Sequence, residues 1–217
     1  MRLSQRATPA VLRTAALAII AATFLYGQGD SRSPGSLDAE RTARDRFNAG
    51  EYDRAVPVLE RAVQAEPGDL KLASLLGMAY LYSSSNTDLA GNLTKAREVL
   101  DKVLSAGGEV VFLAGKGDDP LKSMSVHMVK VIQGELRLRK DSVTFVPSRS
   151  STGGFGPLAA SEVKECAANK GYGQDSNAFH LKLQKETVNL RPLHFSREEA
   201  NLACSLIGKY LGAKTSN

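Results

Sequence analysis

Two patterns of apolar and polar residues divide the chain near Gly107. From Leu37 to Ala106, apolar side chains recur every three or four residues, as they do on one face of an α-helix. Breaks at Gly50, at EPGD (66–69) and at SSSNTD (83–88) predict four helices of about 12 to 15 residues each. Asp69, the last residue of EPGD, can cap the helix that follows it. After Gly107, short runs of alternating apolar and polar residues predict strands. We therefore expect an α+β chain in which the helices precede an antiparallel sheet.

The second half also predicts two β-hairpins. In GELRLR (134–139) the leucines point to one face and the charged residues to the other, KDS forms the turn, and VTF (143–145) continues the buried face. Residues 179–190 repeat this arrangement around QKE, with Phe179 and Leu190 among the buried positions. The two hairpins predict the body of a small sheet or barrel.

The last predicted element is an amphipathic helix. Ser196 with Glu199 forms a capping box, and Phe195 with Ala200 forms a hydrophobic staple, so we expect the helix to begin at Ser196. Its apolar stripe suits a helix that lies across an open sheet. The stripe consists of Ala203, Leu206, Ile207, Tyr210 and Leu211.

The helical half repeats with a period of 34 residues. Ala43 corresponds to Gly77, Phe47 corresponds to Leu81, and after a small insertion Ala55, Leu59 and Ala62 correspond to Ala96, Leu100 and Val103. A 34-residue helix-turn-helix period is typical of tetratricopeptide (TPR) repeats. GEYDRAVPVLERAVQAEPGD resembles the turn and second helix of one such repeat, and LLGMAYLY resembles the first helix of the next. The resemblance covers residues 36–107, and an ordinary pair of helical hairpins is the alternative.

The TPR resemblance implies a binding groove lined by the first helix of each repeat. A mixture of aromatic, Arg and Met side chains suits contact with a protein partner. The implied partner-binding residues are Arg44, Phe47, Asn48, Met78, Leu81 and Tyr82. Because two repeats form a short array, the alternative is that the second half of the chain covers these residues.

The second half, residues 108–215, resembles a pleckstrin-homology (PH)-like domain. The similarity rests on several antiparallel strands followed by one amphipathic helix and on the G-x-L-x-turn-x-V-x-F run. A generic small α+β domain is the alternative. Basic residues in RLRK (137–140) match the hairpin that lipid-binding members use, but the alternation makes Arg137 and Arg139 an ordinary solvated strand face. Contact of this domain with a membrane surface is an alternative that the sequence leaves open.

The first 29 residues have the layout of a signal peptide. Arg2, Arg6 and Arg13 precede the uncharged run AALAIIAATFLY, which is too short for a comfortable membrane span. We therefore expect a periplasmic or secreted protein, with an uncleaved membrane anchor as the alternative. A linker over 30–36 that ends in a helix cap at Ser36, a helical domain over 37–107 and a β-rich domain with a terminal helix over 108–217 complete the predicted organisation.

The net charge of +5 does not indicate nucleic-acid binding. Three of the 28 basic residues lie in the leader, which has no acidic residue, so 25 basic and 23 acidic residues follow it. A protein that binds the phosphate backbone usually carries a concentrated basic face. We therefore expect a protein partner and no nucleic acid.

The two cysteines, Cys166 and Cys204, leave two interpretations open. In an exported protein a disulfide between them would persist. Both cysteines also lie in apolar surroundings, where buried free thiols are equally common.

No pattern of catalytic or metal-binding residues emerges from the sequence. The three histidines lack metal-site spacing, and we find no nucleophile elbow, no Cys-x-x-Cys pair and no phosphate-binding loop. We expect no enzyme, no metal and no cofactor; an acid–base set of Glu162, Glu165 and His180 is the weakest alternative. The sequence thus predicts an exported adaptor or assembly factor of the cell envelope. A lipid- or small-molecule-binding module that uses the C-terminal β domain is the alternative function.

Overall fold

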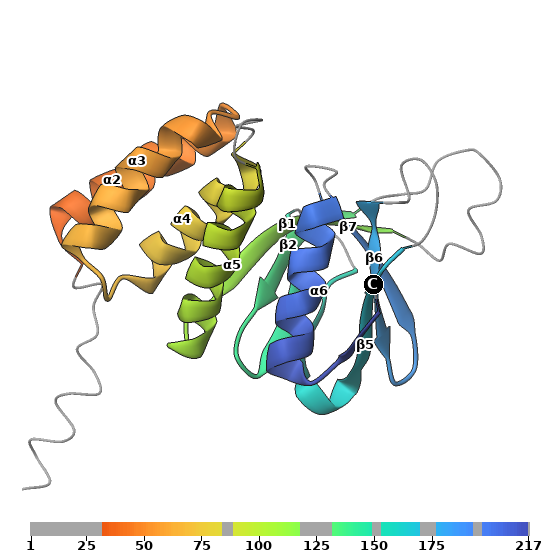
Figure 1. Ribbon diagram of the computed structural model, residues 1–217. Coiled ribbons are helices and arrows are strands. Elements are labelled where there is room, and N and C mark those ends of the chain that lie inside the picture. Colours follow the sequence, from red (N-terminus) through yellow and green to blue (C-terminus); the bar gives the residue numbers. More distant parts are fainter. Residues whose placement is uncertain are drawn as a thin grey trace, which may run out of the picture. The chain divides into compact units, whose positions relative to one another are not determined.

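The computed structural model is an α+β fold in which four helices precede an antiparallel-rich sheet and a further helix (Figure 1). It describes residues 32–83, 89–117, 132–148, 153–169, 177–192 and 197–216. The predicted signal peptide over 1–29 lies outside these residues, as do Phe195 and Ser196 of the predicted helix start. Among the described helices, none is long and apolar enough to cross a membrane.

The four predicted helices are present, and they carry the labels of Figure 1. They are α2 (Pro34–Asn48), α3 (Tyr52–Ala65), α4 (Leu70–Tyr82) and α5 (Leu89–Ser105). The carboxylate of Asp69 caps α4 by accepting hydrogen bonds from the backbone N–H groups of Lys71 and Leu72, at 3.0 and 3.1 Å. This cap was predicted from the turn sequence EPGD.

The start of α2 differs from the prediction. The helix begins at Pro34, which is suited to a first helical turn because it has no N–H to leave unsatisfied. Residues 34–36 therefore belong to the helix, and Ser36 is not its cap. Ser36 is buried instead, and its hydroxyl donates to the Asp69 carboxylate at 2.6 Å.

Helix α4 is buried on nearly all sides, because it packs against α3 and α5 and also contacts β1. It approaches α5 closely at Gly77, where a β-carbon would lie 2.4 Å from a methyl carbon of Leu100. Gly77 is therefore the residue that lets these two helices meet. The buried apolar residues of α4 are Leu72, Leu76, Met78, Ala79, Tyr80 and Tyr82.

The described strands form one sheet in the order β4-β3-β2-β1-β7-β6-β5-β8. All neighbours are antiparallel except β5 and β8. The strands are β1 (Val110–Gly117), β2 (Ile132–Leu138), β3 (Ser142–Pro147), β4 (Phe155–Ala159), β5 (Val163–Ala168), β6 (Phe179–Leu183), β7 (Thr187–Pro192) and β8 (Lys214–Ser216). A short 3₁₀ helix, η2 (Ala160–Glu162), precedes β5.

Both predicted hairpins are confirmed. Leu136 lies opposite Phe145 in the β2–β3 pair, and Phe179 lies opposite Leu190 in the β6–β7 pair. All four side chains are buried. The one-face burial arises from the period of two in the strands.

The last helix, α6 (Arg197–Leu211), packs against β5 (Figure 1). Its predicted apolar stripe faces the core: Ala203, Leu206, Ile207 and Leu211 are buried, and Tyr210 packs partly against them. Cys166 of β5 and Cys204 of α6 are joined by a disulfide with an S–S distance of 2.06 Å. The described residues therefore form the predicted α+β architecture of helices, an antiparallel-rich sheet and a terminal helix.

Candidate functional site

The residues predicted to line a groove lie in two different environments. Arg44 and Asn48 are exposed on α2, and the Arg44 guanidinium pairs with Glu40 one turn earlier at 2.8 Å. Phe47 and Leu81 are partly buried. Met78 and Tyr82 are buried, with 4% and 8% of their surface exposed. A partner can therefore reach the α2 side of the predicted groove, whereas Met78 and Tyr82 on the α4 side are covered.

Three aromatic rings meet at the end of α2. Phe47, Tyr52 and Tyr82, which we call the aromatic cluster, have ring centroids 5.2, 5.3 and 6.2 Å apart. Phe47 meets both tyrosines edge-on, a geometry that the aromatic quadrupole favours. Tyr52 opens α3 and is partly buried, as is Phe47. Phe47 lies within one helical turn of the exposed Arg44 and Asn48 on α2.

The buried ring of the cluster is anchored to α6. The Tyr82 hydroxyl donates a hydrogen bond to the Glu199 carboxylate at 2.6 Å, and only 1% of Glu199 is exposed. Burial, together with the neighbouring Glu199 charge, raises the pKa of Tyr82 well above its ordinary value, and a backbone hydrogen bond at Leu113 opposes this shift. Burial and the Glu199 charge also raise the pKa of Tyr52. The cluster therefore rests on a polar contact between α4 and α6.

Sequence reasoning did not assign these roles to Glu199 and Tyr52. Glu199 was expected to cap α6 through Ser196, and Tyr52 was expected as a motif residue at the start of α3. The sequence feature that could have pointed to Glu199 is an acidic residue next to the apolar stripe of an amphipathic helix. An acidic residue at that position is equally typical of a helix cap. Which tyrosine it would meet, 117 residues away, depended on the tertiary structure.

A second polar junction joins α5 to α6. Lys209 donates to the Asp101 carboxylate at 2.6 Å, and the Tyr210 hydroxyl donates to the backbone carbonyl of Asp101 at 2.9 Å. Ser105 and Tyr210 place their hydroxyl oxygens 2.7 Å apart. The hydrogen bond from Lys209 lowers the pKa of Asp101, and the same bond raises the pKa of Lys209.

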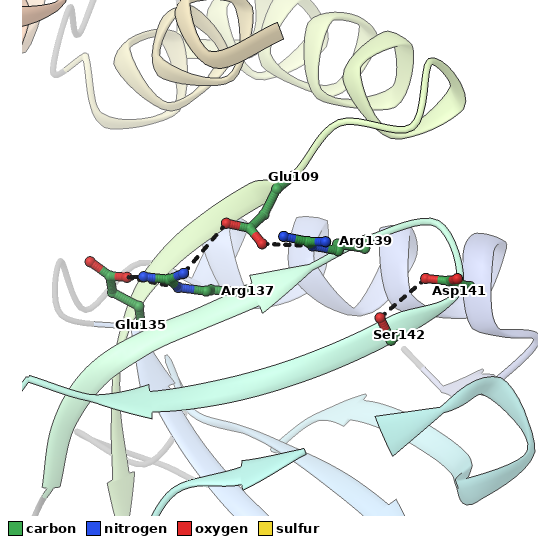
Figure 2. Close-up of polar contacts among 6 residues, drawn as sticks. All are labelled: Glu109, Glu135, Arg137, Arg139, Asp141 and Ser142. Atoms are coloured by element: carbon green, nitrogen blue, oxygen red, sulfur yellow. Dashed lines mark hydrogen bonds and ion pairs between the residues drawn. The ribbon is translucent and has the colours of Figure 1, made fainter. Parts of the chain in front are cut away.

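The basic strand face is paired with carboxylates, as Figure 2 shows. Arg137 contacts Glu135 at 2.7 Å, and Arg139 contacts Glu109 at 2.8 Å. Glu109 also lies 3.8 Å from Arg137, and the bond to Glu135 raises the pKa of Arg137. Because each arginine already faces a carboxylate, this face offers little net positive charge to an anionic lipid headgroup.

The residues of the weakest alternative, an acid–base set, have separate contacts. The Glu162 carboxylate accepts a hydrogen bond from the backbone N–H of Ala159 at 2.9 Å. His180 pairs its Nδ1 with the side-chain oxygen of Asn169 at 3.0 Å. Glu165 lies opposite Lys182 in the β5–β6 pair. Within the described part of the chain, no group of three or more His, Cys, Asp or Glu is arranged to hold a metal ion.

Comparisons with known proteins return weak structural similarity. No protein-family model matches the chain, and no curated protein matches it. The N-terminal PH domain of human ARAP2 aligns at 14% identity and a TM-score of 0.36, covering 48% of this chain and 78% of that one. The C-terminal domain of an unknown protein from Leishmania infantum aligns at 17% identity and the same TM-score, covering 57% and 98%. At these scores the likeness carries no functional inference.

Proposed function

We propose that this chain acts by protein–protein interaction, as an exported adaptor or assembly factor of the cell envelope. In this proposal the helical half is a TPR-type module of two hairpins, and its exposed edge receives the partner. We define the interaction edge as Arg44, Phe47, Asn48 and Tyr52. The proposal carries no enzymatic step and no cofactor.

The equivalent positions of the two hairpins support the TPR-type assignment. Ala55 and Leu59 of α3 are fully buried, and so are their counterparts Ala96 and Leu100 of α5, after the 34-residue period and the insertion. Gly77 lies at a helix crossing where a side chain would collide with Leu100. Small residues at crossings and large residues between hairpins are the requirements of stacked helical repeats.

The observation that carries the proposal is the composition and support of the interaction edge. Two partly exposed aromatic rings meet at the end of α2, within one helical turn of an exposed arginine and an exposed asparagine. Aromatic residues and Arg are enriched where proteins bind one another, because they combine large contact area with directional polar groups. The anchor between Tyr82 and Glu199 holds the cluster in place, so little side-chain freedom is lost on binding.

The alternative function receives less support from the strand face. A lipid-binding module would use the basic residues of the β2–β3 hairpin, yet Arg137 and Arg139 are both paired with glutamates. The proposal therefore assigns binding to the helical half.

The experiment is a cross-linking capture followed by a binding measurement with the purified partner. We would compare the wild-type chain with an Arg44→Glu/Asn48→Lys variant, because both changes lie on exposed α2 positions and should leave the fold intact. Arg61→Glu is the matched control, since Arg61 is also an exposed helical arginine, on α3. We expect the edge variant to weaken binding about tenfold or more and the control to bind as wild type does.

Equal binding by all three chains would overturn the assignment of the interaction edge. Failure of the wild type to bind any defined protein would overturn the adaptor proposal. Cell fractionation with mass spectrometry of the N-terminus tests the location separately: a chain that starts near Asp30 in the soluble envelope fraction is expected, whereas an intact leader in the membrane fraction would indicate an anchor.

A further inference from the structure

A pocket of about 450 Å³ lies beside the disulfide, where α5, α6, β5 and β8 meet. Its size falls within the range of small-molecule sites, which run from about 300 to 1,000 Å³. It does not include any residue of the interaction edge. A ligand at this site would therefore represent a binding function beyond the proposed one.

Polar side chains from three elements converge on this pocket. Helix α6 contributes Asn201, Ser205 and Lys209, which are spaced by four residues and so lie along one helical face. Arg97 comes from α5, and Thr215 comes from β8. Together these residues present a guanidinium, an ammonium, an amide and two hydroxyl groups, which are all hydrogen-bond donors.

Small residues and a covalent link shape the rest of the wall. At Gly208 a β-carbon would lie 2.4 Å from the Thr215 methyl carbon, so only glycine lets β8 pass this close to α6. Ala168 and Ala213 add little bulk. Cys204, another wall residue, is joined to Cys166 of β5. The disulfide therefore joins the helix and the strand that both contribute to the wall, which reduces the ordering cost of binding.

The charges at this site favour an anion. Lys209 is held in place by Asp101 at 2.6 Å, so its charge is partly compensated. Arg97 lies one turn before Asp101 on α5, and in the part of the chain that the structure describes it has no ion-pair partner. Arg97 and Lys209 with the neighbouring Asp101 carboxylate leave one net positive charge at the pocket, next to neutral hydrogen-bond donors. Guanidinium groups bind carboxylates and phosphates through two parallel hydrogen bonds.

We infer that this pocket binds a small organic anion through a carboxylate or phosphate group. The Arg97 guanidinium takes the anionic group, Lys209 adds a positive charge, and Asn201, Ser205 and Thr215 fix its orientation by hydrogen bonds. The pocket exceeds the volume of the anionic group itself, so the remainder of the ligand fills the space over Gly208.

The test uses the purified wild-type chain with two probes, citrate and glycerol phosphate, at constant ionic strength. Isothermal titration measures affinity, and the NMR amide shifts of Ser205, Gly208 and Thr215 locate binding. Arg97→Gln removes the cation that the proposal assigns to the anionic group, and Lys102→Gln is the matched control because it removes one charge from an exposed position of the same helix. We expect about a tenfold loss of affinity in Arg97→Gln and a change within about twofold in the control.

Three results would overturn the inference. The first is that neither probe binds, and the second is that the amide shifts appear elsewhere in the chain. The third is that both variants weaken binding equally, because that result would indicate general charge screening. Vesicles of phosphatidylglycerol in phosphatidylcholine distinguish the source of the anion. Binding of free glycerol phosphate at the pocket supports a soluble ligand. Binding of vesicles that is lost in Arg97→Gln, without binding of free glycerol phosphate, would replace the soluble ligand by a lipid headgroup and so overturn the inference as stated.

Discussion

Single side chains in this protein derive their roles from distant partners. Tyr82 has a place in the repeat pattern of the helical half, but its hydroxyl is bonded to Glu199, which lies 117 residues further along the chain. A buried carboxylate is costly unless hydrogen bonds satisfy it. The tyrosine and the glutamate are therefore expected to depend on each other.

We expect Tyr82→Phe to lower the free energy of unfolding by about 1.5 to 3 kcal/mol, because the variant removes a hydrogen bond to a buried charged group. Urea denaturation followed by circular dichroism measures this change. Tyr80→Phe is the comparison, since the Tyr80 hydroxyl bonds to Glu60, whose side chain is exposed, and we expect a smaller loss there. Equal losses in both variants would contradict a special role for the Tyr82–Glu199 pair.

The same pair predicts a sensitivity to alkaline pH. Because the folded state raises the pKa of Tyr82, the stabilisation is complete below the unfolded-state value of about 10 and is lost as the pH rises through the folded-state value. We expect the unfolding free energy of the wild type to fall more steeply than that of Tyr82→Phe above about pH 10. Urea titrations at a series of alkaline pH values test this, and parallel curves would refute it.

The helices and strands form where the spacing of apolar residues and the capping residues favour the same element. Two of these elements approach closely where a small residue leaves room. Alternation in β2 and β6 put every predicted leucine and phenylalanine on the buried face. Between α4 and α5, Gly77 allows a close approach that a larger residue would prevent.

We expect Gly77→Val to destabilise the chain by about 1 to 3 kcal/mol, because the added side chain collides with the buried Leu100. Gly68→Val is the control, since a β-carbon at Gly68 would have no neighbour within 4 Å, and we expect a change within about 0.5 kcal/mol. Thermal and urea unfolding give both values. A tolerated valine at position 77 would mean that the helices can separate there at little cost.

The covalent link between β5 and α6 also predicts a measurable loss. Replacing both Cys166 and Cys204 with alanine opens a loop of 38 residues, and we expect the free energy of unfolding to fall by about 3 to 4 kcal/mol. The reduced wild type should lose a similar amount. If the double variant unfolds at the same urea concentration as the oxidised wild type, the disulfide contributes little.

The helical half and the sheet belong to one compact unit over Gly35–Asn217. Two polar junctions connect them, one between Tyr82 and Glu199 and the other between Asp101 and Lys209. Tyr82 of α4 is buried where it meets Glu199 of α6. The two halves are therefore expected to depend on each other for stability.

We expect the helices and the sheet to unfold in a single transition. Amide hydrogen exchange in α3 and in β6 should report the same global unfolding free energy, because the two polar junctions couple the halves. Asp101→Asn, which weakens one junction, should lower both values together. Separate transitions, or a loss confined to one half, would show that the helical domain is independent.

Local sequence patterns were sufficient to predict the helices, the two hairpins and one helix cap. The period of two identified the hairpins, the three- and four-residue spacing identified the helices, and Asp69 identified a cap, because each depends on residues close together in sequence. The start of α2 depended on a distant contact: Ser36 has the chemistry of a cap, yet its hydroxyl donates to Asp69, 33 residues further along the chain. A polar residue near a helix start can serve either purpose, and its sequence neighbours do not distinguish them.

The candidate sites also combine features that the local sequence predicts with features that depend on distant contacts. Sequence alone predicted the α+β fold class and the order of helices, strands and a last helix, and the TPR resemblance singled out Arg44, Phe47 and Asn48 as groove candidates. The tertiary structure decided that Met78 and Tyr82 are covered, that Cys166 meets Cys204, and that Arg97 and Lys209 share a pocket. The physical reason is range: helix and strand formation depends on contacts within a few residues, whereas burial and charge pairing depend on which distant elements pack together.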